Sequence, residues 1–441
     1  MRMQKFKNLI LGTFIVALTL HGFGQATTNS PYSKYGIGVL RSESFNQNFA
    51  LGGAGLGFRS NSSLNLLNPA SYSEISITTV EFGVTNNALW LSDGTQSQFQ
   101  NNAYIDHIAF GFPVINNKWG MSFGMLPYSN VGYDYQNTDR VSLVEGDTID
   151  LNYYYKGDGG LNKVYFGNAL KFRIDSTSNV SFGVNASLIF GSINADKKVV
   201  YGNLPSSYNT WQITKSSVAD FNFDAGIQYQ KTFINAKDEK YNLTIGATYT
   251  LGRELKSKDS DLIRTFAGNI EFGTAKDTIL NVDEQAGIIE LPSQIGAGIA
   301  FEKQNKWTVL VDYKTTAWDK VQNSEPNLYQ YKMSHSINGG FEFIPKYDAF
   351  NNYFKRIKYR IGARYKTSYL TINDKNINEY GITFGLSLPM KRTDSAIPGL
   401  NFGLEYGKRG TTDAGLVEEK FVNFNFGITI NDRWFIKRKY D

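Results

Sequence analysis

The 441-residue chain contains no cysteine, and it has only 3 histidines and 10 prolines. Without cysteine, disulfide frameworks, thiolate metal sites, iron–sulfur clusters and cysteine nucleophiles are excluded together. His21 lies in a predicted signal peptide, which leaves His107 and His335 in the mature chain. Two histidines and no cysteine leave no plausible zinc triad, so we expect no metal and no cofactor.

The chain also lacks a large excess of either positive or negative charge. The chain has 45 basic and 40 acidic side chains, and removal of Arg2, Lys5 and Lys7 leaves 42 against 40. No basic block dominates the sequence, so nucleic acid is not an expected partner.

Long apolar runs are absent except near the N-terminus. The run 9–20 follows Lys5 and Lys7 and precedes the small residues Gly22, Gly24 and Ala26. A basic region, a short apolar run and a small-residue site predict a secretory signal peptide over residues 1–26. The run is too short to cross ~30 Å of hydrocarbon as a helix. If the mature chain enters a membrane, it must do so with strands.

The chain is instead rich in aromatic residues and in period-two patterns. Between residues 241 and 252, apolar residues at odd positions alternate with Asn, Thr and Gly at even positions. Such alternation predicts a strand with one apolar and one polar face. A soluble β-sandwich would alternate too. However, these runs are about 11–18 residues long, which exceeds the usual ~5–6 of globular proteins and suffices to cross a bilayer.

Fourteen strands follow from this pattern. We place them at 77–90, 103–114, 118–134, 160–174, 178–192, 217–234, 241–255, 292–303, 306–317, 329–345, 355–368, 376–388, 397–407 and 418–431. The connections alternate between long ones of about 18 residues and short ones of about 5, as in bacterial outer-membrane barrels. The sequence therefore predicts an all-β fold, a 14-stranded antiparallel transmembrane β-barrel over 77–431 with both termini in the periplasm. The long connections at 135–159, 193–216 and 256–291 are expected to be loops around the extracellular mouth.

Residues 27–76 show no strand period, yet they are too apolar to be disordered. We expect them to form a plug, or hatch, inside the barrel, and residues 432–441 to form a basic periplasmic tail. Glycine recurs on the polar phase of the strands, which fits either barrel curvature or space in the lumen. These glycines are Gly111, Gly183, Gly226, Gly246, Gly362, Gly385, Gly403 and Gly427.

The hatch ends in Asn68-Pro69-Ala70 immediately before the first strand. This motif, followed by fourteen strands, resembles the FadL-type family of outer-membrane channels for long-chain fatty acids and aromatic hydrocarbons. The segments PYSKYG and RWFIKRKYD resemble a branch that includes a type IX secretion outer-membrane component. The resemblance implies passive uptake of a hydrophobic small-molecule ligand from outside a Gram-negative-type cell, with release into the surrounding outer-membrane lipid. The alternative is a non-transporting scaffold with a secretion-machinery protein as its possible partner.

In the family, the ligand leaves through a gap beside a kinked third strand. The third predicted strand here carries Pro127 in its middle, and proline cannot donate to a β-ladder. We therefore predict a lateral opening, although a bulge that only adds curvature remains an alternative. The predicted opening comprises Gly124, Leu126, Pro127, Tyr128 and Asn130.

A row of positive charge lies on the inward phase of strand 355–368, and acidic residues occur on the inward phases of other strands. Such a row could attract a carboxylate or phosphate, but buried charge is normally paired, so an internal ion-pair network is the preferred interpretation. The residues are Lys358, Arg360, Arg364, Lys366, Asp224, Asp312 and Glu342.

Catalysis is not expected. A hydrolase barrel needs a serine two residues from a histidine so that both side chains share one face of the strand. The positions two after the histidines hold Ala109 and Ile337. We therefore predict no catalytic residues.

Overall fold

The computed structural model describes residues 28–142, 148–202, 207–268, 273–323, 326–390 and 396–432. The predicted signal peptide at 1–26 and residues 433–441 of the predicted tail lie outside these ranges. In the described part of the chain, none of the helices has both the length and the apolar character that a membrane span requires.

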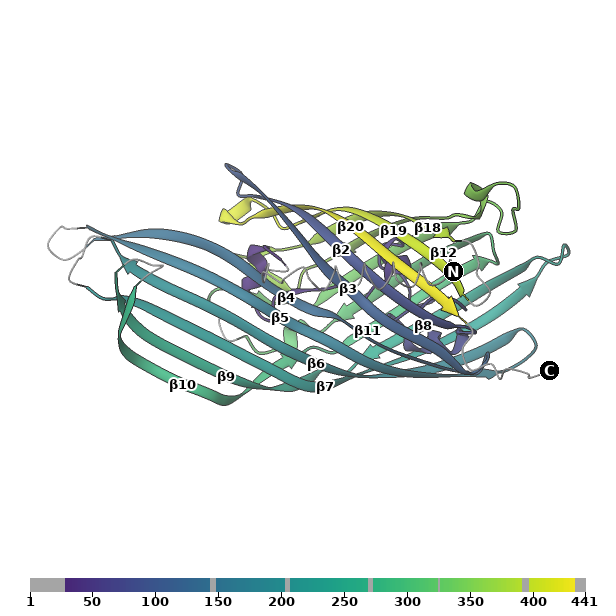
Figure 1. Cartoon of the computed structure of the whole chain (residues 1–441), viewed down its shortest axis with the longest axis horizontal. Coiled ribbons are helices and arrows are strands. Elements are labelled where there is room, and N and C mark those ends of the chain that lie inside the picture. Colours follow the sequence, from purple (N-terminus) through teal and green to yellow (C-terminus); the bar gives the residue numbers. More distant parts are fainter. Residues whose placement is uncertain are drawn as a thin grey trace, which may run out of the picture.

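Fourteen strands form a closed antiparallel barrel, as the sequence predicted (Figure 1). The first and last of them close the wall, because β2 and β20 pair from Thr78 with Asp432 to Ser92 with Glu418. The barrel strands are β2 (Thr78–Ser92), β3 (Ser97–Ile115), β4 (Trp119–Ser142), β5 (Thr148–Arg173), β6 (Ser178–Tyr201), β7 (Asn209–Ile234), β8 (Lys240–Thr250), β11 (Gln294–Lys303), β12 (Trp307–Thr316), β14 (Ser334–Phe343), β15 (Lys358–Lys366), β18 (Glu379–Pro389), β19 (Ala396–Arg409) and β20 (Glu418–Asp432).

The outer face of the barrel is apolar and the inner face is polar. In β18, Ile382 and Phe384 are 49% and 50% exposed, whereas Thr383 between them is 1% exposed and faces inward. The same alternation recurs around the barrel. An exposed apolar surface of this size is unstable in water and matches the hydrocarbon core of a bilayer.

The expectation of long loops at 135–159, 193–216 and 256–291 is wrong. The strands β4 and β5 stay paired out to Ser142 and Thr148, and β9 (Arg253–Ala267) and β10 (Thr274–Leu291) form a further hairpin. These extensions form a long sheet on one side of the barrel (Figure 1). Water reaches both faces of much of this sheet, so its residues carry little apolar alternation and the pattern that reveals strands is missing.

The remaining elements are short. They are η1 (Pro31–Lys34), β1 (Val39–Leu40), α2 (Asn46–Phe49), η2 (Pro69–Glu74), η3 (Trp318–Lys320), β13 (Gln330–Tyr331), η4 (Tyr353–Arg356), β16 (Leu370–Ile372), β17 (Lys375–Asn376) and η5 (Asp413–Gly415). The first four belong to residues 28–76, which we call the hatch and which lie within the barrel (Figure 1).

Candidate functional site: the hatch and a gap in the wall

The hatch shares three apolar clusters with the barrel wall. Phe45 and Tyr72 of the hatch pack with the wall residue Tyr165, and all three are at most 1% exposed. A second cluster joins Leu51 and Phe58 to wall residues of β11 and β12. The hatch is therefore part of the barrel core.

Wall glycines provide the space that the hatch occupies. At each of the eight glycines found on the polar phase, a Cβ atom would collide with a hatch residue, so they serve as seats for the hatch. The pairs are Gly111 with Leu64, Gly183 with Pro69 and Ala70, Gly226 with Asn68, Gly246 with Leu56, Gly362 with Leu51 and Gly52, Gly385 with Ala50, Gly403 with Phe49, and Gly427 with Asn46.

The Asn68-Pro69-Ala70 motif anchors the hatch. The Asn68 side chain caps η2 by accepting a hydrogen bond from the Ala70 backbone N–H at 3.1 Å. Its amide donates to the backbone oxygens of Leu56 at 2.8 Å and Ile227 at 3.2 Å. Asn68 therefore joins two parts of the hatch to strand β7, while Pro69 starts the helical turn, where a missing N–H costs nothing.

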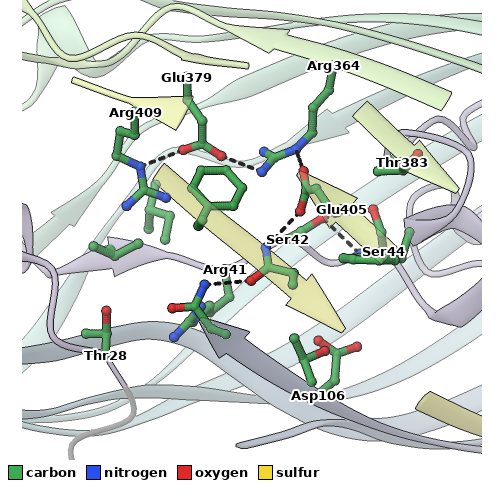
Figure 2. A pocket seen from close by; sticks show the side chains of 18 of the residues that line it. Thr28, Arg41, Ser42, Ser44, Asp106, Arg364, Glu379, Thr383, Glu405 and Arg409 are labelled. Atoms are coloured by element: carbon green, nitrogen blue, oxygen red, sulfur yellow. Dashed lines mark hydrogen bonds and ion pairs between the residues drawn. The ribbon is translucent and has the colours of Figure 1, made fainter. Parts of the chain in front are cut away.

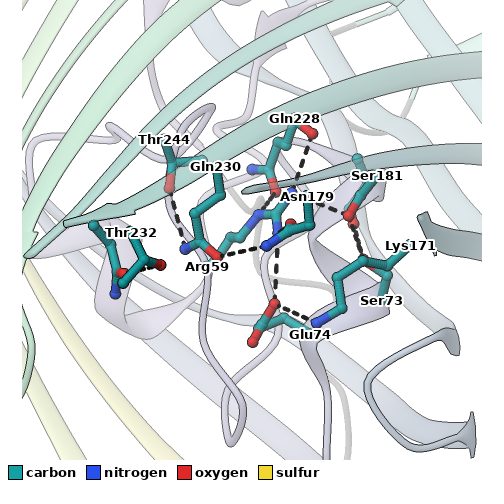
Figure 3. A network of polar contacts seen from close by, with 12 residues as sticks. Arg59, Ser73, Glu74, Lys171, Asn179, Ser181, Gln228, Gln230, Thr232 and Thr244 are labelled. Atoms are coloured by element: carbon teal, nitrogen blue, oxygen red, sulfur yellow. Dashed lines mark hydrogen bonds and ion pairs between the residues drawn. The ribbon is translucent and has the colours of Figure 1, made fainter. Parts of the chain in front are cut away.

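Arg59 forms a second anchor that sequence reasoning missed (Figure 3). Its guanidinium donates to Gln228 at 2.8 Å, to Asn179 at 2.6 Å and to Ser181 at 3.0 Å, and forms an ion pair with Glu74 at 3.5 Å. A planar guanidinium can satisfy several acceptors at once, which makes it suitable for a buried junction. A single arginine in an irregular segment carries no pattern that could have revealed this role.

The barrel wall is interrupted between β3 and β4. Their ladder starts at the pair Ile115–Trp119, beside the short turn between the strands, and ends at the pair Ile108–Met125. Beyond it, residues 97–107 of β3 pair with β2, and β4 continues along β5. The two strands diverge in Figure 1. Pro127 lies just past the last β3–β4 pair, at a register shift between β4 and β5.

The predicted opening residues lie on this edge of β4. Gly124 is paired with Ala109, next to the last rung, and Leu126 is 3% exposed. The Tyr128 backbone oxygen accepts from the Arg41 N–H at 3.0 Å, and Asn130 pairs with Val39. The structure thus brings all five together. Nothing in it tests their role in release, which stays a proposal.

The hatch residues 28–41, which we call the seal, bridge the two sides of the gap. On the β4 side, β1 pairs at Ser129 and Asn130. On the β3 side, Asn29 donates to Gln100 at 3.0 Å, and the Arg41 guanidinium lies 4.2 Å from the ring centroid of Tyr104. Tyr32 and Ile37 of the seal are each 6% exposed and pack in an apolar cluster with wall residues such as Leu161. The seal is therefore held by apolar as well as polar contacts, and none of them is covalent.

Charges in the lumen form networks of ion pairs (Figure 2). Arg364 contacts Glu379 and Glu405, each at 2.5 Å, and Glu379 also contacts Arg409 at 2.7 Å. Arg409 in turn contacts Glu419 at 3.3 Å. Three carboxylates around two guanidiniums satisfy most of the hydrogen-bonding capacity of these groups, as buried charge requires.

The other predicted lumen charges are dispersed. Arg360 contacts Glu342 at 2.7 Å, and Lys358 shares that carboxylate at 3.9 Å. Asp224 contacts Lys163 at 3.1 Å. Asp312 does not pair with the row but accepts from the N–H groups of Gly55 and Leu56 at 2.6 and 2.9 Å in the hatch. Lys366 lines a lumen cavity.

Sequence reasoning missed Glu379, Glu405, Arg409 and Glu419, although they line the largest network. Glu379, Arg409 and Glu419 lie at or near a strand end, where the apolar alternation fades, so the inward phase could not be assigned there. Glu405 lies within the clear alternation of β19, between Leu404 and Tyr406, and was missed although its inward phase could be assigned. The predicted acidic residues Asp224, Asp312 and Glu342 lie in clearer stretches of alternation, so their inward phase could be predicted. Their ion-pair partners could not, because these depend on which strands are neighbours in space.

The cavities above the hatch are small and polar. One, of about 130 Å³, is lined by the Arg364–Glu379 network and by the seal (Figure 2). The other, of about 210 Å³, is lined by Tyr128, Lys163 and Lys366. Binding pockets for small ligands usually hold ~300–1,000 Å³, so each of these two cavities is smaller than such a pocket with the hatch in this position.

The contacts of the two histidines are those of residues with a structural role. His107 is fully buried, stacks on Phe45 with ring centroids 4.1 Å apart, and its Nδ1 lies 2.8 Å from the Asp106 carboxylate. His335 lies 2.7 Å from the Tyr313 hydroxyl. Among the described residues, no group of three or more acidic or histidine side chains could hold a metal ion.

The fold, the apolar belt and the internal hatch define an outer-membrane β-barrel of the FadL type. Solved structures share this fold at low sequence identity. The CymD monoaromatic hydrocarbon channel has a TM-score of 0.55 and 13% identity and covers 90% of this chain and 99% of its own. The toluene transporter TodX of P. putida has a TM-score of 0.55 and 13% identity, and the match covers 90% of this chain and 100% of TodX. A Pseudomonas aeruginosa FadL homologue has a TM-score of 0.56 and 10% identity, and the match covers 90% of this chain and 99% of the homologue.

The chain belongs to the BamG family, whose sequence model matches residues 5–441. Among curated proteins, it is 22% identical over 319 residues to the uncharacterized protein ORF1 of Spiroplasma virus SpV1-C74. That match covers 66% of this chain and spans 41% of the viral protein. The solved structures above are those of a monoaromatic hydrocarbon channel, a toluene transporter and a FadL homologue.

Proposed function

We propose that the protein is a gated outer-membrane channel that passes hydrophobic small molecules sideways between its lumen and the lipid. The observation that carries this proposal is the β3–β4 ladder, which stops at Ile108–Met125. A closed barrel normally pairs each strand on both sides, because unpaired backbone groups are costly in lipid. A gap filled by a separate, non-covalently held segment is suited to opening.

The rim of the gap favours exchange with lipid. The side chains of Ile105 and Met125 are 54% and 43% exposed on the outer face, on the two sides of the gap. An apolar molecule leaving beside them would stay out of water. Movement of the seal would open the gap and enlarge the polar cavities behind it.

The polarity of the lumen bears on the class of substrate. Charged and hydroxyl groups line the two cavities, including Arg364, Lys163 and Glu379. These groups already form ion pairs with one another, but a neutral aromatic hydrocarbon would displace water from their free faces, which costs free energy. Of the two substrate classes expected from the resemblance, a fatty acid with a polar carboxylate fits this lumen better than an aromatic hydrocarbon.

A second candidate is a permanently plugged scaffold that binds protein partners. The fit of the hatch to the wall favours it, because glycine seats and the Arg59 junction hold the centre of the hatch firmly. The two functions differ in whether the seal moves while the rest of the hatch stays in place.

Uptake into liposomes tests the proposal. Purified protein is reconstituted, and entry of a fluorescent long-chain fatty acid and of an aromatic hydrocarbon is compared with empty liposomes. We expect fatty-acid uptake above the empty control, reduced severalfold in Pro127→Ala, because alanine restores a backbone donor at the edge of the gap. The matched variant Pro113→Ala, in the paired part of β3, should behave as wild type. Equal uptake with and without protein would favour the scaffold.

A further inference from the structure

A cavity of about 680 Å³ lies under the hatch, at the end of the barrel that carries the β14–β15 and β18–β19 connections. The short strand connections at this end predict that it faces the periplasm. It shares no lining residue with the two cavities above the hatch. Strands β15, β18, β19 and β20 form its wall, and Asn46 and Ser63 of the hatch also line it. Its volume is that of a typical ligand pocket, and its predicted position on the periplasmic side does not depend on whether the channel transports.

The charge around this cavity is positive. Arg356, Lys358 and Arg360 line it, and Arg360 and Lys358 share the single carboxylate of Glu342. Among the described residues, no carboxylate forms an ion pair with Arg356, whose guanidinium lies 5.5 Å from the ring centroid of Tyr353. Glu81 also lines the cavity, but it is 1% exposed and accepts a hydrogen bond from a hatch backbone N–H.

Exposed aromatic residues flank the basic side chains. The connection between β14 and β15 carries Tyr347 and Tyr353, which line the cavity and are 59% and 40% exposed. Phe350 and Phe354 of the same connection are 98% and 70% exposed. This green connection projects past the neighbouring strand ends in Figure 1. Large exposed apolar side chains grouped in this way mark interaction sites.

One buried hydrogen-bond acceptor in the lining lacks a partner. Asn46 is 2% exposed, and its Oδ1 atom has no hydrogen-bond donor. This oxygen is enclosed against Gly83 of β2 and Gly427 of β20, so it does not select the occupant of the cavity.

We propose that this cavity docks an acidic segment of a periplasmic protein that also carries an aromatic or aliphatic side chain. The carboxylates would contact Arg356 and Lys358, and the apolar side chain would pack against Tyr347 and Tyr353. A protein segment fits better than a membrane lipid because inward-facing residues of the barrel, such as Asn401, form the wall. The proposal does not depend on transport.

Binding of a labelled peptide to the full chain in detergent or nanodiscs tests it. The probes are a fluorescent hexapeptide of alternating Glu and Phe and its Lys–Phe counterpart. We expect the acidic peptide to bind and the basic one to bind at least tenfold more weakly. The double variant Arg356→Glu/Lys358→Glu should weaken acidic binding at least tenfold, while Lys355→Glu, a neighbour that does not line the cavity, should change it less than twofold.

Three outcomes would overturn the proposal. Equal binding of both peptides would show that the cavity does not select charge. An equal loss in Lys355→Glu and the double variant would show a diffuse electrostatic effect. Displacement of the acidic peptide by short-chain phosphatidylglycerol micelles, but not by unlabelled peptide, would identify a lipid site. Unchanged melting temperatures of the variants ensure that lost binding does not reflect unfolding.

Discussion

The Ser33 hydroxyl and the Gly132 backbone hydrogen-bond in both directions. Ser33 Oγ donates to the Gly132 oxygen at 3.0 Å, and the Gly132 N–H donates back to Ser33 Oγ at 3.0 Å. This reciprocal contact joins η1 to the edge of β4 that β3 leaves open. The Ser33 side chain thus makes the hydrogen bonds that a neighbouring strand would make, and it pairs both the N–H and the oxygen of Gly132.

Replacing Ser33 by alanine should loosen the seal. Two hydrogen bonds are lost, each worth about 0.5–1.5 kcal/mol, so we expect the Gly132 amide to exchange with solvent about tenfold faster or more. Hydrogen–deuterium exchange measures this directly. Ser60→Ala, which affects a contact with Ser63 inside the hatch, is the control. Unchanged exchange at Gly132 would mean that other contacts hold the seal.

The neighbouring glycines 339 and 340 provide a matched test of the glycine seats. A Cβ on Gly340 would meet the Leu51 backbone oxygen at 2.6 Å, whereas on Gly339 the one contact is at 3.8 Å. Overpacking typically costs about 1–3 kcal/mol. Gly340→Ala should therefore lower the denaturant midpoint and expose the hatch to protease, with little effect from Gly339→Ala. Equal stability of the two variants would contradict a seating role.

Removing one charge from the Arg364–Glu379–Arg409 network should destabilise the barrel. Glu379→Gln leaves two buried guanidiniums with less neutralising charge, and breaking a buried pair costs about 3–5 kcal/mol. Denaturant unfolding in detergent measures the loss. Asp150→Asn removes an exposed pair with Arg140, which is 71% exposed, and should change nothing measurable. Similar stability of the two variants would show that the network is dispensable.

An arginine on the lipid face should impair membrane insertion. Phe384→Arg places a charge in the apolar belt, at a cost of about 2–4 kcal/mol near the bilayer midplane. The amount of folded protein in the membrane fraction should fall. Ile279→Arg, at a 63% exposed position of β10 in the extended hairpin, is the control. Equal amounts of the two folded variants in the membrane fraction would show that Phe384 does not lie in the apolar belt that contacts lipid.

The sequence predicted the barrel well because lipid on one side and water on the other impose period two on every spanning strand. In β18, the alternation of Ile382 and Phe384 with inward-facing residues was sufficient to predict the strand and its outer face. Where both faces meet water, as in β10, this constraint is absent, and no strand could be predicted from the pattern of residues.

The site could be predicted only in part. Pro127 marked the edge of β4, because a residue without an N–H has a specific position in a wall. The seal and the Arg59 junction could not be predicted, since they depend on contacts between residues such as Arg59 and Asn179 that lie 120 positions apart. Irregular segments have no period from which such neighbours follow.

A disulfide across the seal tests the central claim most directly. Val39 and Asn130 lie opposite each other in β1 and β4, and an antiparallel pair has the Cα spacing that a disulfide needs. With no native cysteine, Val39→Cys/Asn130→Cys forms one defined bond. The control, Ile299→Cys/Val311→Cys, links a wall pair of β11 and β12. We predict that oxidation abolishes fatty-acid uptake by the seal variant, that reduction restores it, and that the control is unaffected. Equal uptake by the oxidised and reduced seal variant would contradict a gate at this gap.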